Sequence, residues 1–99
     1  MDFDAIIEKG KDGIKPLTQS ILDHIDDPEF CLEACKAVSS LAVDDDSRAT
    51  FSEAGVMIDL IEILVKHRKV KEVCNAACNA VRSVIFDSGK YTTFSQTLL

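Results

Sequence analysis

The sequence repeats itself at a spacing of 43 residues, and this spacing limits the folds that the chain can adopt. Residues 31–40 match residues 74–83 at six of ten positions. The same offset relates the tripeptide Thr-Phe-Ser at 50–52 to its copy at 93–95. A period of about 40–47 residues is typical of helical solenoids, in which each unit packs only against its neighbours.

The repeat divides the chain into one complete unit and two partial units. We expect a single repeat domain over residues 1–99, with a partial unit at 1–43, a complete unit at 44–86 and a partial unit at 87–99. Solenoids usually need roughly three units to bury their faces. Phe94 and Leu98, in the interrupted last unit, would therefore lack the next helix. Apolar ends of this kind predict an interface or a risk of aggregation.

Apolar residues recur at helical spacing, and no segment alternates apolar and polar residues as a strand does. Asp27-Pro28-Glu29 is a helix start, with a capping residue, a proline at the first position and an acid that complements the dipole. The helix that follows has an apolar stripe that recurs 43 residues later: Phe30, Ala34, Val38 and Leu41, then Val73, Ala77, Val81 and Val84.

The chain between these two helices predicts the rest of the unit. We expect a polar turn at residues 44–47, a short helix at 48–54 and a second helix at 56–65. Gly55 separates the two helices because the corner needs a positive φ or a close approach. Met57, Leu60, Ile61 and Leu64 lie on one side of the second helix. The predicted fold class is therefore all-α.

These pieces resemble armadillo repeats over nearly the whole chain. The matching segments are Asp27-Pro28-Glu29, residues 33–42, Glu53-Ala54-Gly55 and residues 60–64. HEAT-type units are the nearest alternative, and the Glu-Ala-Gly corner favours armadillo. The resemblance implies a short right-handed superhelix, an α-α solenoid, whose third helices line a concave surface.

Members of the armadillo family bind extended peptides on this surface through a Trp and an Asn one turn apart. The Trp positions match Lys36 and Asn79 here, and the Asn positions match Ser40 and Ser83. None of the four keeps the family's binding residue, which argues against recognition of nuclear import signals.

The resemblance implies a non-catalytic interaction module, a scaffold or adaptor, that binds a protein or an extended peptide. Polar side chains on a rigid groove suit hydrogen bonding to a peptide backbone. The expected contacts are Lys36, Ser40, Asn75, Asn79, Arg82 and Ser83. The alternative is a structural assembly unit that uses its open apolar ends, either as a homo-oligomer or as a piece of a longer solenoid.

Four cysteines form two CxxxC pairs, and we interpret them as small buried core residues. A less favoured reading has two neighbouring third helices present four sulfurs to one zinc ion, although the usual tight CxxC knuckle is absent. We expect no disulfide in a reducing compartment. The sequence thus predicts no metal and no cofactor.

Charge and motifs exclude several function classes. The net charge of −6 and pI near 4.7 argue against nucleic-acid binding, and no apolar run is long enough for a membrane span. The acidic N-terminus does not resemble a signal peptide, so we expect a cytoplasmic or nuclear protein. No nucleophile motif supports an enzyme. Residues 1–46 are acidic and residues 47–99 slightly basic, which suggests head-to-tail stacking as a minor hypothesis.

Overall fold

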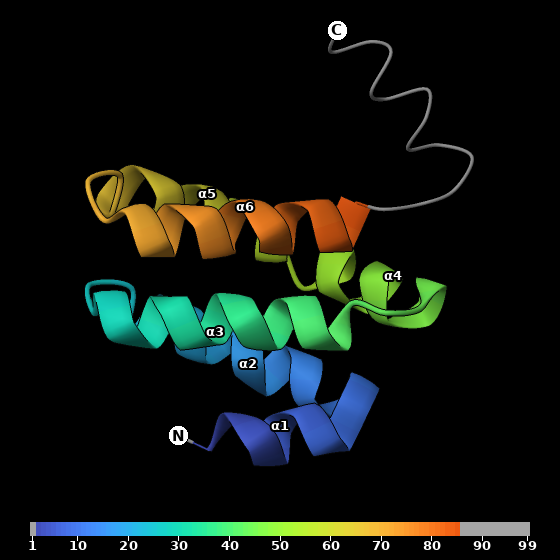
Figure 1. Cartoon of the computed structure of the whole chain (residues 1–99). Coiled ribbons are helices and arrows are strands. Elements are labelled where there is room, and N and C mark those ends of the chain that lie inside the picture. The colour runs from blue at the N-terminus through green and yellow to red at the C-terminus, as the bar shows by residue number, and fades with distance from the viewer. Residues whose placement is uncertain (1, 86–99) are drawn as a thin grey trace, which may run out of the picture.

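The computed structural model describes residues 2–85, which form a stack of helices (Figure 1). The helices are α1 (Phe3–Lys9), the 3-10 turn η1 (Gly10–Gly13), α2 (Ile14–Asp23), α3 (Pro28–Leu41), α4 (Asp45–Glu53), α5 (Val56–Lys66) and α6 (Lys71–Ile85). No strand occurs within these residues, and the expected all-α class is confirmed. The expected partial unit at 87–99, with Phe94 and Leu98, lies outside them.

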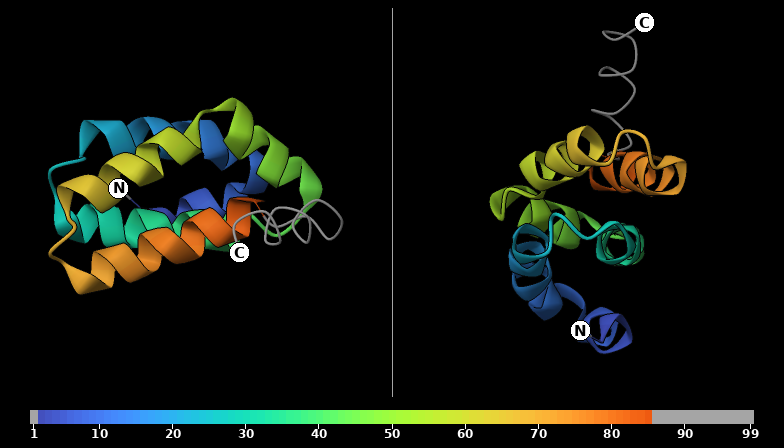
Figure 2. Two further views of the ribbon diagram at one scale, coloured as in Figure 1. Left: turned by 90° about the horizontal axis from the view of Figure 1, so that it is seen from above. Right: turned by 90° about the vertical axis from the view of Figure 1, so that its left-hand side faces the viewer.

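The helices form two columns, seen most clearly in the right-hand view of Figure 2, which looks along the helix axes. In that view α1, α3 and α6 lie one above another, and α2, α4 and α5 form the second column. Helix α6 packs on α3 and on α5, while α4 contacts α2, α5 and α6. Helices α3 and α6 therefore run side by side and in the same direction (Figure 1).

The predicted helix start at Asp27-Pro28-Glu29 is confirmed. The Asp27 carboxylate accepts hydrogen bonds from the Glu29 and Phe30 amides at 3.0 and 3.3 Å. Pro28 is the first residue of α3, where its missing amide proton removes no helical hydrogen bond. This cap fixes where α3 begins, and so sets which of its side chains face α6.

The turns before α3 and α6 share their hydrogen bonds at an offset of 43 residues. The Asp27 amide donates to the His24 carbonyl at 3.0 Å, and the Val70 amide donates to the His67 carbonyl at 2.9 Å. A cysteine thiol donates to the same carbonyl in each turn: Cys31 to His24 at 3.7 Å, and Cys74 to His67 at 3.3 Å. The α2–α3 and α5–α6 helix pairs thus have matching turns.

Two contacts join these turns to each other. Nε2 of the buried His67 lies 2.7 Å from the Ile25 carbonyl, and Lys66 forms an ion pair with Asp26 at 2.8 Å. The Lys66 ammonium lowers the pKa of the Asp26 carboxyl below its ordinary value. Both contacts hold the start of α6 beside the start of α3.

The predicted boundary between a turn at 44–47 and a helix at 48–54 was wrong, because α4 spans Asp45–Glu53. Asp44 is the cap, and its carboxylate accepts a hydrogen bond from the Ser47 amide at 2.7 Å. This bond lowers the pKa of the Asp44 carboxyl. Asp45 and Asp46 then occupy the first helical turn, where acids complement the helix dipole.

Gly55 has φ 78°, which is the left-handed region, and a Cβ built there meets no atom within 4 Å. Of the two expected reasons for this glycine, the positive φ is therefore the one that applies. Close approach is instead found at Gly13, where a Cβ would lie 2.4 Å from the Ile6 carbonyl oxygen. Gly13, the last residue of η1, thus lets this turn pack tightly against Ile6 of α1.

The core runs through both columns, and most of the predicted stripe residues are buried in it. Phe30 and Val81 are only half-buried, and Ala80 is buried on α6 beside the predicted Val73, Ala77 and Val84. On α5 the predicted side was wrong at Ile61, which is 53% exposed. The buried side consists of Val56, Asp59, Leu60 and Ile63, because α2, α4 and α6 contact that side of the helix.

The cysteines divide into two groups. Cys31 and Cys35 are buried, as core packing predicted, whereas Cys74 is half-buried and Cys78 is exposed. The expectation of core packing was therefore wrong for Cys78. The reason lies in the stack: α3 has α6 above it, and no described helix covers the outer side of α6.

Candidate functional site

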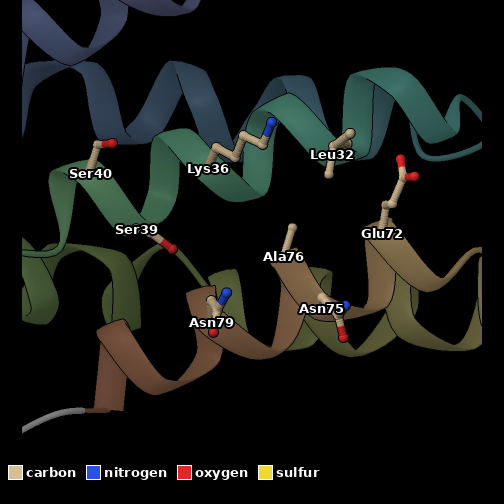
Figure 3. A pocket seen from close by; sticks show the side chains of 8 residues that line it. All are labelled: Leu32, Lys36, Ser39, Ser40, Glu72, Asn75, Ala76 and Asn79. Atoms are coloured by element: carbon tan, nitrogen blue, oxygen red, sulfur yellow. The ribbon is translucent and has the colours of Figure 1, made fainter.

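A hollow of about 650 Å³ lies along the seam between α3 and α6 (Figure 3). Leu32 and Ala76 point toward one another across the seam and give it a half-buried apolar floor. Polar side chains from both helices stand around this floor. The hollow is lined by Leu32, Lys36, Ser39 and Ser40 of α3 and by Glu72, Asn75, Ala76 and Asn79 of α6.

A second hollow of about 570 Å³ continues toward the carboxyl ends of the two helices. It shares Ser39 and Asn79 with the first hollow, so the two are contiguous. Arg48 of α4 lines the second hollow as well. Its remaining lining residues are Ala42, Val43, Arg82 and Ser83. We call the two hollows together the α3–α6 groove.

All six residues expected to contact a partner line this groove. Lys36, Ser40 and Asn75 line the first hollow, Arg82 and Ser83 line the second, and Asn79 lines both. Parallel packing of α3 and α6 brings them together, because residues one helical turn apart then point to the same side of the seam.

Three polar or charged lining residues were missing from the predicted set: Ser39, Glu72 and Arg48. Glu72 lies three residues before Asn75, and that spacing on one helix could have found it. Arg48 comes from α4 and reaches α6 across 35 residues of sequence. No local pattern marks a contact of that kind.

Arg48 connects α4 to the last turn of α6. Its Nε donates to the Ser83 carbonyl at 3.2 Å, and its guanidinium pairs with Asp45 at 2.9 Å. The Arg48 side chain is only 17% exposed. A cation at the carboxyl end of a helix complements the helix dipole, so Arg48 stabilises the wall of the second hollow.

Three of the predicted contact residues are already oriented by hydrogen bonds. The Arg82 guanidinium donates to Oδ1 of Asn79, which leaves the Asn79 amide nitrogen as a donor toward the groove. The Ser83 hydroxyl donates to the Asn79 carbonyl at 2.9 Å. Lys36 pairs with Glu33 at 3.7 Å, and both side chains are more than half exposed, so that pair is weak.

The two buried thiols are poorly suited to nucleophilic or metal chemistry. Burial raises the pKa of the Cys35 thiol to about 12, and burial with the nearby Asp27 and Asp26 carboxylates raises that of Cys31 to about 11. Both therefore stay protonated at neutral pH, whereas the thiolate is the reactive and metal-binding form. Within residues 2–85 no cluster of three or more His, Cys, Asp or Glu side chains could hold a metal ion.

Comparison with known protein families, with curated protein sequences and with solved structures found no match. Among the described helices, none combines the length and the apolar character needed to cross a bilayer. The candidate site therefore rests on its own geometry: a groove between two helices, with amides and cations among the side chains that line it.

Proposed function

We propose that this chain is an armadillo-type, non-catalytic interaction module that binds an extended peptide segment of a partner protein in the α3–α6 groove. The observation that carries the proposal is the convergence of Lys36, Ser40, Asn75, Asn79, Arg82 and Ser83 on that groove. The matching turns before α3 and α6 support the repeat on which the proposal depends.

The polar side chains around the groove suit an extended peptide. An extended chain has free backbone amides and carbonyls that need partners, and these side chains can supply them. Asn75 and Asn79 lie one turn apart on α6, and an amide side chain can both donate and accept. Leu32 and Ala76 give one apolar contact on the floor between them.

The groove is also rigid, which lowers the entropy lost on binding. Its walls are two packed helices, and Arg48 fixes the end of α6 to α4. The lining residues include no histidine or cysteine. Binding without chemistry is the function that this set of side chains serves best.

The test is a selection of peptides from a displayed library of random twelve-residue sequences against the full chain. The selected peptides are then measured against Asn79→Ala/Arg82→Ala by fluorescence anisotropy. These two side chains bond to each other, so removing both leaves neither unpaired. We expect affinity to fall at least about tenfold, because two hydrogen bonds of about 1 kcal/mol each are lost.

The matched control is Gln19→Ala, which removes an exposed amide side chain from α2, outside the groove. Its affinity should equal that of the wild type. Equal affinity of Asn79→Ala/Arg82→Ala and wild type, with unchanged helical circular dichroism, would refute the groove assignment.

A further inference from the structure

The two ends of the α3–α6 groove carry opposite charges. Glu72 lies in the first turn of α6 and lines the first hollow, whereas Arg82 lies in the last turn and lines the second. In Figure 3, Glu72 stands at one end of the first hollow, and Asn79, which accepts a hydrogen bond from Arg82, stands at the other. An acid at the start and a cation at the end of a helix also complement its dipole. The surroundings of the two charges therefore decide whether they serve binding as well as the helix.

Neither charge is neutralised within the part of the chain that the structure describes. Both residues are exposed, and none of the ion pairs between described residues includes Glu72 or Arg82. Arg82 donates a hydrogen bond to the neutral Oδ1 of Asn79, but a guanidinium has five N–H donors, so others remain. A bound segment can therefore pair with both charges without breaking an existing ion pair.

The amino end of the groove is acidic on both helices. Glu29, the residue of α3 that matches Glu72 at the 43-residue offset, is also an exposed acid in the first helical turn. The cations of the α5–α6 turn do not line the groove: Lys66, Arg68, Lys69 and Lys71. The first three of them line a separate hollow, which shares no residue with the groove. They therefore leave the acidic character of this end in place.

The carboxyl end of the groove is basic. Arg48 and Arg82 both line the second hollow, and no carboxylate is among its lining residues. Arg48 pairs with Asp45, so Arg82 supplies the charge that has no carboxylate partner among the described residues. An anionic side chain in this hollow would therefore meet cations only.

The distance between the two charges sets the spacing that a partner needs. Glu72 and Arg82 lie about 15 Å apart along α6, since ten residues separate them and the helix rises about 1.5 Å per residue. An extended chain advances about 3.3 Å per residue, so about four or five residues span this distance. Asn75 and Asn79 lie between the two charges and offer amides to the backbone of those residues.

We propose that the groove selects its peptide by charge: a Lys or Arg of the peptide pairs with Glu72, and an Asp or Glu about four or five residues away pairs with Arg82. This selectivity rests on the peptide binding proposed above for the same groove. Exposed ion pairs add little affinity, but two like charges brought together are unfavourable. Glu72 and Arg82 therefore determine which peptides bind, and the amides of Asn75 and Asn79 hold the peptide backbone.

The first test repeats the selection of random twelve-residue peptides on two forms of the full chain. One is the wild type, and the other is Glu72→Lys/Arg82→Glu, in which the two charges are exchanged. The wild type should enrich peptides with a basic and an acidic residue about four or five positions apart, in one order along the peptide. The exchanged variant should enrich the opposite order. Pools without such pairs, or pools in which the order does not change, would overturn the proposal.

The second test measures one selected peptide by fluorescence anisotropy. Arg82→Glu should weaken its binding about three- to tenfold, because an exposed ion pair is replaced by a repulsion of similar size. A peptide whose acidic residue is changed to Lys should bind Arg82→Glu as tightly as the original peptide binds the wild type. The matched control is Lys15→Glu, which reverses an exposed charge on α2 outside the groove and should leave the affinity unchanged.

The outcomes separate this inference from the proposed function. If Arg82→Glu weakens binding and the altered peptide does not restore it, Arg82 acts through its hydrogen bond to Asn79, and selection by charge is overturned while the groove remains the binding site. If Asn79→Ala/Arg82→Ala binds the selected peptides as the wild type does, or if no peptide is selected, both proposals fail.

Discussion

The fold requires glycine at positions 13 and 55 for different physical reasons. This difference gives the sharpest test of the fold. A Cβ on Gly13 would lie 2.4 Å from the Ile6 carbonyl oxygen and 3.0 Å from Ile6 Cγ2, while the φ of Gly13 is an ordinary −85°. A Cβ on Gly55 meets nothing within 4 Å, but φ is 78°. Space limits the first position and backbone conformation limits the second.

The same substitution should therefore destabilise by different amounts at the two sites. At Gly13, alanine forces the end of η1 away from Ile6 of α1, and overpacking of this kind costs about 1–3 kcal/mol. At Gly55, the left-handed conformation costs alanine about 1–2 kcal/mol. At both sites the lower entropy of the unfolded chain offsets about 0.4–1 kcal/mol of the loss. We expect a net loss of about 1 kcal/mol at Gly55 and a larger loss at Gly13.

Alanine and asparagine should rank in opposite order of stability at the two sites, and this difference is the decisive measurement. Gly55→Asn should be more stable than Gly55→Ala, because asparagine tolerates the left-handed region. Gly13→Asn should be less stable than Gly13→Ala, because the side chain is larger and the Ile6 carbonyl cannot move without α1. Urea unfolding followed by circular dichroism gives the four free energies. If Gly13→Ala were neutral or stabilising, α1 would not pack on η1 as described.

Three further predictions concern the caps, the buried acid and the thiols. Asp27→Ala should cost about 1 kcal/mol in urea unfolding because it removes the cap of α3, whereas Asp27→Asn should restore most of it. Burial, and next the Glu62 carboxylate, raise the pKa of Asp59, so the ionised form opposes folding. The resulting stability is present below the ordinary pKa of 3.8 and lost as pH rises through the raised value. Asp59→Asn should thus be more stable than wild type at neutral pH, with the difference closing in acid; an advantage independent of pH would contradict this. A thiol reagent should modify Cys78 in the native monomer much faster than Cys35, and equal rates measured by mass spectrometry would contradict their burial.

The local features of this fold could be predicted from the sequence because each depends on residues close together in the chain. Asp27-Pro28 starts α3 through a cap that spans three residues, and Gly55 ends α4 through its own φ. The helical spacing of apolar residues fixed the all-α class. The boundary of α4 was missed because three consecutive aspartates can each cap a helix, and the hydrogen bond from Ser47 selects Asp44.

Burial and the composition of the groove were decided by the tertiary structure. Cys35 and Cys78 occupy matching positions of a repeated sequence, yet one is buried and the other exposed, because α6 lies over α3 and no described helix lies over α6. Arg48 joins the groove only because α4 crosses to the end of α6. A repeat gives every copy the same side chains, but the exposure of those side chains depends on their neighbours in the stack, which no single unit specifies.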